Sequence, residues 1–326
     1  MTKTAWFRLA MFGCVAAMLA TPAAAQEWPS RPIKVVTALA PGGAVDALVR
    51  TVGEELTTNL KQPVIVENRP GGGGSVAAIS VARAAPDGYT LLLGSAGPLN
   101  ITPLITKNVG YDTLTDFTPL TLAVELPIVL VVHKDFPANN VAEFVAYAKA
   151  NPGKISFGSS GTHTTHHIAG EFLKAHAALN MVHIPYRGGN PAMTDLLAGQ
   201  IPALFATLST TLPHIDGGNL KVIGMIEAKR SIARPEIPTI GETVKGYSIP
   251  SSWLGYVGPP NMPAPLTQKI HTELVKAINT PSVTKALEKA GFEVITSKST
   301  AEFGIFIKDA MERYRKIVAE SNIEAQ

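Results

Sequence analysis

Short runs of apolar, often β-branched residues recur along the chain, and segments with helical periodicity lie between several of them. The predicted strands are Ile33–Leu39, Val64–Glu67, Thr90–Gly94, Ile128–His133, Ile155–Gly158, Val182–Pro185, Ala203–Ala206 and Lys221–Ile226. Nearly continuous apolar runs indicate strands that are buried on both faces. Because such strands alternate with helices, the predicted fold class is α/β, with parallel sheets that helices cover on both sides.

Two predicted helices have the clearest apolar stripes, with spacings of three and four residues. The first stripe consists of Val45, Leu48, Val49, Val52, Leu56 and Leu60. The second consists of Phe303, Phe306, Ile307, Ala310, Tyr314, Ile317 and Val318. Glycine and proline mark turns between elements, and the run Gly71–Gly74 predicts an exposed turn before a helix that begins near Ser75.

The N-terminal segment has the form of a secretory signal peptide. Lys3 and Arg8 precede an apolar stretch, Leu9–Ala20, that is too short to span a membrane. Ala23-Ala24-Ala25 then provides the small residues that signal peptidase requires. Residues 1–25 are therefore predicted to be removed, which leaves a periplasmic chain that begins at Gln26.

Composition limits the classes of protein that the mature chain can belong to. Its only cysteine, Cys14, lies in the leader, and Met11 stands where a lipoprotein signal needs Leu or Val. An exported chain without disulfides must be stabilised by a packed core, and about 300 residues suffice for two domains. Without Lys3 and Arg8 the formal net charge falls from +3 to +1. With no basic stripe, neither nucleic acid nor an anionic membrane is expected as a partner.

The first predicted strand runs directly into a loop with proline and two glycines. Leu39, Ala40, Pro41, Gly42 and Gly43 separate this strand from a helix whose first turn contains Asp46. Unpaired backbone N–H groups and the positive end of the helix dipole favour an anion at such a helix start. The alternative is a plain tight turn in which Asp46 only stabilises the helix.

Two further loops follow predicted strands in the same way. Ser159, Ser160, Gly161, Thr162, His163, Thr164 and Thr165 precede a helix for which Thr164 or Thr165 is the expected N-cap. Tyr186–Pro191 is expected to place Asn190 at the N-cap and Pro191 at the first helical position. Open α/β sheets bind ligands at the carboxyl ends of their strands, so these loops favour a binding site.

Metal binding and enzymatic catalysis find less support in the residues. His163, His166 and His167 would share a helical face with Glu171 one turn on, but zinc sites usually have a better-defined set of ligands. Helix capping and ligand contact by His163 are preferred, and neither a metal nor a cofactor is predicted. Gly158-Ser159-Ser160-Gly161 does not have the spacing of a nucleophile elbow, and no Gly-Lys-Ser/Thr phosphate loop occurs. The chain is therefore not expected to be an enzyme.

Several stretches together resemble a known family. They are Trp28–Ile33, Ala40–Gly43 with Asp46, Val66–Gly71, Ala85–Leu91, His183–Gly188, Thr194–Gln200 and Ser252-Trp253. From Trp28 to about Ala325 the chain resembles the extracytoplasmic receptors of tripartite tricarboxylate transporters, often called Bug receptors. The resemblance implies the two-lobed Venus flytrap fold of type-II periplasmic binding proteins, in which each lobe is a mostly parallel sheet flanked by helices. Residues 26–122 and 252–326 would form domain 1, residues 123–251 domain 2, and the hinge would lie near Leu122–Val124 and Ser252-Trp253.

The resemblance also implies a ligand and the residues that bind it. The ligand would be a small organic carboxylate held between two jaws, mostly through backbone amides and ordered waters. The first jaw would be Leu39–Gly43 with Asp46, and the second would be Ser159–Thr164. The rest of the pocket would be lined by Ser95, Gly97, Gly188, Gly189, Asn190, Thr207 and Trp253. Leu39, His163 and Ala206 depart from the residues common in the family, which leaves aliphatic, amino-acid and aromatic carboxylates open.

The resemblance thus predicts a monomeric receptor that delivers its ligand to the membrane subunits of a tripartite transporter. One alternative is a periplasmic sensor that acts on a signalling protein in the membrane. The other is a secreted hydrolase with a scattered catalytic set.

Overall fold

The computed structural model describes residues 27–39, 41–42, 44–231, 234–323 and 325. The chain divides into two units, Met1–Ser30 and Arg31–Gln326, and every helix and strand named below lies in the second. The predicted signal peptide with Cys14, and Ala40 and Gly43 of the first loop, lie outside the described residues. No helix in the described part of the chain is long and apolar enough to cross a membrane.

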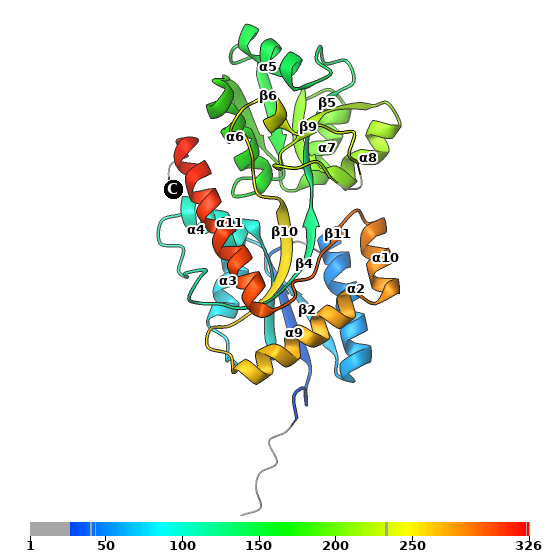
Figure 1. Cartoon of the computed structure of the whole chain (residues 1–326), viewed down its shortest axis with the longest axis vertical. Helices are drawn as coiled ribbons and strands as arrows, with labels where there is room; N and C mark the ends of the chain where they lie inside the picture. The colour runs from blue at the N-terminus through cyan, green and yellow to red at the C-terminus, as the bar shows by residue number, and fades with distance from the viewer. Residues whose placement is uncertain (1–26, 40, 43, 232–233, 324, 326) are drawn as a thin grey trace, which may run out of the picture. The chain divides into compact units, whose positions relative to one another are not determined.

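The first sheet has six strands in the order β11-β4-β10-β3-β1-β2 (Figure 1). Their bounds are β1 (Ile33–Thr37), β2 (Val64–Asn68), β3 (Thr90–Ser95), β4 (Thr118–Leu126), β10 (Ser252–Gly258) and β11 (Glu293–Val294). The strands β1 to β4 run in one direction, and β10 and β11 run against them. This mixed sheet keeps its parallel part at β1, β2 and β3, where the first loop begins.

Two groups of helices pack around the first sheet. One consists of α2 (Ala44–Leu60), α9 (Ala264–Ile278) and α10 (Pro281–Lys289), and the other of α3 (Ser75–Ala82), α4 (Thr102–Ile105) and α11 (Thr300–Glu320). Both predicted stripes are confirmed, because Leu48, Val49 and Val52 of α2 and Phe303 and Tyr314 of α11 are buried.

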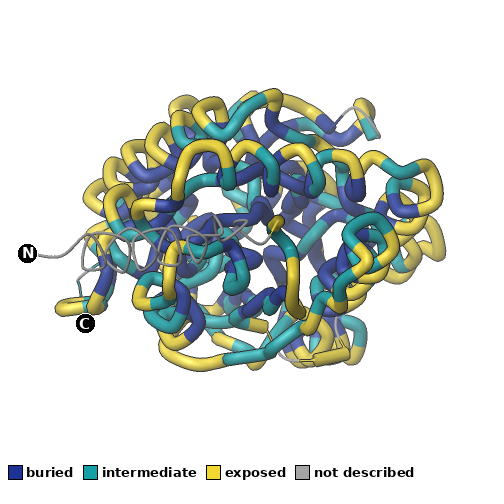
Figure 2. Tube along the Cα trace, turned by 90° about the horizontal axis from the view of Figure 1, so that it is seen from below, coloured by how far each residue is buried: buried dark blue, intermediate teal, exposed yellow. Residues whose placement is uncertain are grey.

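The second sheet has five strands in the order β7-β6-β8-β5-β9. They are β5 (Ile128–His133), β6 (Ile155–Ser159), β7 (Met181–Pro185), β8 (Ala203–Thr207) and β9 (Leu220–Met225), and only β5 runs against the others. One apolar cluster packs α5 (Val141–Ala150) and α6 (Thr165–Ala177) on it, and a separate cluster packs α7 (Gly189–Leu197) and α8 (Leu208–Asp216). Strands β5, β6, β8 and β9 are mostly buried, whereas the edge strand β7 is partly exposed. Across the molecule, buried segments lie inside and exposed segments outside (Figure 2).

All eight predicted strands are present, and the predicted α/β fold is confirmed, with two mixed sheets in each of which most strands run in one direction. The structure adds β4, β10 and β11. In β10 the sequence signal is weakened by Gly255 and Gly258, which have low strand propensity. The fold requires a small residue at 255, because a Cβ there would lie 2.3 Å from Cζ of Phe303.

The chain changes sheet at two places. Strand β4 ends at Leu126 and β5 begins at Ile128, so the first change is at Pro127. The return runs through residues 249–251 into β10, after the Ile249 N–H donates to the Ile226 carbonyl over 2.9 Å. Next to this return, the Tyr314 hydroxyl on α11 donates to the Pro250 carbonyl and bonds to Thr165 Oγ1 on α6. Elements of the two sheets therefore touch beside the crossing.

Candidate ligand-binding site

The first predicted loop is held from inside by Asp46. The Asp46 side chain is buried, and its Oδ2 accepts hydrogen bonds from the Gly42 N–H (3.1 Å) and from Arg50 Nε (2.9 Å). Its Oδ1 accepts from Asn68 Nδ2 (3.1 Å), which also donates to the Leu39 carbonyl (2.9 Å). The hydrogen bonds from Arg50 and Gly42 lower the pKa of Asp46 to about 2. Asp46 is thus a charged carboxylate that positions the loop.

The hydrogen bonds of Asp46 determine which way the Gly42 N–H points and how the charge near the first loop is balanced. The Gly42 N–H points inward to Asp46, and Gly42 has φ of 88°, a left-handed conformation that favours glycine. Arg50 balances the charge of Asp46, so the carboxylate does not oppose an anion at the start of α2. Sequence reasoning missed the roles of Arg50 and Asn68, although Asn68 lies in one of the stretches that carried the resemblance.

The second predicted loop is organised by its own hydroxyl groups. Ser159 is fully buried, and its Oγ donates to the Gly161 carbonyl and accepts from the Gly161 N–H, both over 3.1 Å. Thr164 Oγ1 donates to the same carbonyl (2.7 Å) and accepts from the His167 N–H (3.3 Å). Thr164 is the N-cap of α6, which confirms one of the two residues expected there. The loop therefore lies at the N-terminus of α6, where the helix dipole has its positive end.

His163 of the second loop lies against segments of the first sheet. A Cβ added to Gly97 would lie 3.2 Å from the His163 carbonyl, and one added to Gly73 would lie 3.0 Å from His163 Cβ. His163 Nε2 also lies 3.3 Å from Thr106 Oγ1. Burial lowers the pKa of His163. The structure thus brings two predicted site residues, Gly97 and His163, into contact across the two sheets.

The three clustered histidines have separate surroundings. His163 has φ of 65° and precedes the helix, which begins at Thr165, so the expected shared helical face is wrong for His163. His166 Nδ1 bonds to Ser160 Oγ (2.7 Å), its Nε2 lies 3.5 Å from Thr207 Oγ1, and burial lowers its pKa to about 4. The His167 ring stacks on His183, with ring centroids 4.4 Å apart. Burial, followed by the charges of His167 and Lys174, lowers the pKa of His183 to about 3.

The third loop lies beside the second. The Tyr186 N–H donates to the Ser159 carbonyl (3.1 Å), and the Tyr186 hydroxyl donates to Asp195 (2.7 Å). The expectation of an Asn190 cap is wrong, because α7 begins at Gly189 and its N-cap is Gly188. Pro191 is the third helical residue rather than the expected first, and it is tolerated there because the N–H groups of the whole first turn lack helical partners. Gly188 and Gly189 have open space where a side chain would be.

Trp253 and Ser95 occupy the first sheet near the segment η2 (Gly97–Ile101). Trp253 is fully buried, its Nε1 donates to Asn100 Oδ1 (3.1 Å), and its ring meets Phe303 edge-on. The Asn100 amide in turn donates to the Ile307 carbonyl (3.1 Å). These contacts support η2, and with it Gly97, from the interior of the first sheet. Sequence reasoning missed Asn100, whose partners lie more than 150 positions away in the chain.

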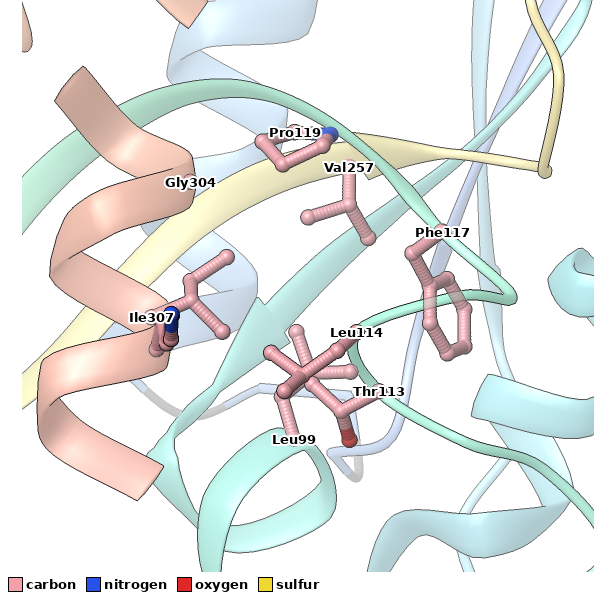
Figure 3. A pocket seen from close by; sticks show the side chains of 9 residues that line it. Leu99, Thr113, Leu114, Phe117, Pro119, Val257, Gly304 and Ile307 are labelled. Atoms are coloured by element: carbon pink, nitrogen blue, oxygen red, sulfur yellow. The ribbon is translucent and has the colours of Figure 1, made fainter. Parts of the chain in front are cut away.

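A cavity of about 350 Å³ lies apart from these loops (Figure 3). Most of its lining is apolar and comes from β4, β10, α11 and the segment before β4. The lining residues are Leu99, Thr113, Leu114, Phe117, Pro119, Val257, Gly304, Ile307 and Lys308. None of the predicted site residues is among them. We therefore place the candidate site at the loops, where helix starts and hydroxyl groups gather.

Comparison with known proteins gives a consistent result. Residues 48–323 match the family described as "Tripartite tricarboxylate transporter family receptor". A UPF0065 protein of Bordetella pertussis is 35% identical over 311 residues, which cover 95% of each chain. The solved structure of the periplasmic binding protein BugD is 32% identical with a TM-score of 0.78, and the match covers 92% of this chain and 100% of that one.

Two solved structures of similar proteins contain ligands. Rpa4515 of R. palustris with adipate is 28% identical with a TM-score of 0.81, covering 91% of this chain and 99% of that one. MatC of Rhodopseudomonas palustris with bound malate is 26% identical with a TM-score of 0.79, covering 89% and 100%. The family match and the whole-chain relatives lead to one classification. The chain belongs to the receptor family of tripartite tricarboxylate transporters, whose members are periplasmic solute-binding receptors and not enzymes.

Proposed function

We propose that this receptor binds a small organic carboxylate between the first loop, at the start of α2, and the second loop, at the start of α6. The observation that carries the proposal is the contact of His163 with Gly73 and Gly97, which closes the second loop onto the first sheet. A helix start that faces another part of the protein in this way is a partly enclosed anion site. Adipate and malate in the similar structures support a dicarboxylate as the ligand.

The two sheets would act as two lobes in this proposal. The chain crosses between them at Pro127 and at residues 249–251, so a hinge there would let the second loop move away from Gly73 and Gly97. Ser95, Gly188, Gly189, Asn190 and Thr207 would line the space between the lobes. The signal peptide would direct the protein to the periplasm as a monomer, where it would deliver the ligand to the membrane subunits of a tripartite transporter.

A matched carboxylate is expected to raise the melting temperature by several degrees, whereas its neutral ester is not. Saturation at a hundred times Kd adds about 2.7 kcal/mol to the stability of the bound form. The measurement is a thermal-shift panel of adipate, malate and related acids, each paired with its dimethyl ester. Equal shifts for acids and esters would show that recognition does not rest on an anion at a helix start.

Asp46→Ala is expected to weaken binding of the acid selected by that panel at least tenfold, about 1.4 kcal/mol. The substitution frees the Gly42 N–H, Arg50 and the Asn68 amide together, so the first loop loses its fixed shape. Titration calorimetry on the folded variant measures the loss.

Asp87→Ala is the matched control for Asp46→Ala. The Asp87 carboxylate also accepts hydrogen bonds from an arginine, Arg31 (2.8 Å), and from a backbone N–H, that of Tyr89 (3.1 Å), but it lies at the opposite end of the strands. The affinity of the Asp87→Ala variant for the selected acid should equal that of the wild type. An unchanged affinity in Asp46→Ala would remove the first loop from the proposed site.

A further inference from the structure

Three side chains with metal-binding atoms converge between α6 and β7. His167 and Glu171 lie one helical turn apart on α6, and His183 lies on the neighbouring strand. One ligand atom from each lies within 4.8 Å of the other two, and among the described residues this is the only such group. A spacing of four residues puts His167 and Glu171 on the same helix face, so both can reach one ion.

The one hydrogen bond found for the His183 ring, between Nε2 and Ser159, is compatible with metal binding by the other ring nitrogen. Ser159 Oγ donates its single hydrogen to the Gly161 carbonyl and lies 2.7 Å from His183 Nε2. These contacts are compatible with the tautomer in which His183 Nε2 donates to Ser159 and Nδ1 keeps its lone pair. Metal-bound histidines are oriented in this way, by a hydrogen bond from the nitrogen that does not bind the ion.

His167 has a buried ring nitrogen, Nδ1, without a hydrogen-bond partner in the described structure. Leaving a buried polar atom unpaired is unfavourable, and such atoms are uncommon in folded proteins. The ring is also fixed, because it stacks on His183, which in turn stacks on Phe157 at 5.0 Å. An ion at the centre of the group would give the His167 ring the partner that the protein does not supply.

We propose that His167, Glu171 and His183 bind a divalent transition-metal ion, Zn²⁺, between α6 and β7. Two histidines and one glutamate are a ligand set that zinc accepts, with water at a fourth position. Through Ser159, the ion would be tied to the second loop. The inference does not rest on the proposed carboxylate binding. The ligand set differs from His163, His166 and His167, which were not predicted to bind metal, because His183 comes from a separate strand.

Lys174 is the one feature that opposes the ion. Its Nζ donates to Glu171 Oε2 over 2.7 Å, so an ammonium group already balances part of the charge on the carboxylate. The ion and the ammonium group compete for Glu171. Removing the lysine charge is therefore expected to strengthen metal binding, which no site elsewhere on the protein would show.

The test is titration calorimetry of the metal-free mature protein with Zn²⁺. We expect one ion per chain, at least tenfold weaker binding in His167→Ala and in Glu171→Gln, and tighter binding in Lys174→Met. His176→Gln is the matched control, because His176 lies on the same helix outside the group, and its binding should equal that of the wild type. Substituted Co²⁺ should give the visible absorption of a low-symmetry site, and this absorption should be lost in His167→Ala.

Two results would overturn the proposal. One is that the wild-type protein takes up no Zn²⁺. The other is that the His167→Ala and Glu171→Gln variants bind Zn²⁺ as the wild type does. Circular dichroism and the carboxylate thermal shift, recorded without metal, check that each variant is folded and binds its ligand. A lost zinc site with an intact carboxylate response therefore differs from a failure of the proposed receptor function.

Discussion

Glu227→Gln is expected to differ from the wild type in stability by less than about 1 kcal/mol at pH 5 and to exceed it by several kcal/mol at pH 8. Glu227 follows β9 and is buried, with its Oε1 accepting from the Ile128 N–H over 2.9 Å. Its Oε2 is buried and has no hydrogen-bond partner in the described structure. A neutral carboxyl group or amide fits this site, and a carboxylate does not.

The pKa of Glu227 determines the pH range of the effect. Burial raises it from the usual 4.5 to about 8, the hydrogen bond from Ile128 opposes the shift, and the nearby Glu125 and Glu293 add to it. Because the folded pKa is above the unfolded one, the stability is fully present below pH 4.5 and is lost as the pH rises to 8. The loss is about 1.4 kcal/mol for each pH unit in that window.

Denaturant unfolding of the wild type and Glu227→Gln from pH 5 to pH 9 measures the difference directly. Contributions from His166 and His183, whose depressed pKa values destabilise the fold as the pH falls, cancel in this comparison. Glu54→Gln, at an exposed position of α2, should follow the wild-type curve. A constant difference between wild type and Glu227→Gln across the range would mean that Glu227 ionises normally in the folded protein.

Glu227 lies near the place where the chain passes from the first sheet to the second. Glu227 bonds to the N–H of Ile128, the first residue of β5 and the one after Pro127. The Ile128 N–H donates to the charged carboxylate as well, so the cost of ionisation comes from burial and from Glu125 and Glu293.

The sequence predicted the parts of the fold that depend on local pattern. Strand β5 is a near-continuous apolar run, which is typical of a buried strand, and the structure has a buried strand at that position. The start of α6 was equally local, because Thr164 caps the helix through an atom three residues away. Such signals lie within one element, so reading the sequence along its length is enough to find them.

Contacts between distant elements left little trace in the sequence. Asn68 holds Asp46 from 22 positions away, and Ser159 orients His183 from 24. Neither pair follows a helical or strand period, so no spacing indicates it. Glu227 gave no signal either, because a glutamate in a sequence carries no sign of whether it is buried.

Gly170→Ala is expected to destabilise the protein by about 2 kcal/mol or more. Gly170 lies on α6 over Phe157 of β6, and a Cβ added there would lie 2.0 Å from Cε2 of the ring. The fully buried ring has no room to turn away, because Phe205 meets it edge-on at 5.7 Å and His183 stacks on it at 5.0 Å. Overpacking of this kind costs about 1–3 kcal/mol and occasionally more, which exceeds the gain of less than about 1 kcal/mol in helix propensity.

Gly304→Ala is the matched control, because Gly304 also lies in the interior of a helix, α11. The nearest atom to its added Cβ is Cγ of Pro119 at 3.4 Å, an ordinary contact distance. Only the gain in helix propensity remains there, so this variant should be stabilised by up to about 1 kcal/mol. Denaturant unfolding of both variants gives opposite signs if α6 packs directly on Phe157. If Gly170→Ala is also stabilised, the ring can move aside, and the fixed stack of Phe157, His183 and His167 behind the second loop does not exist.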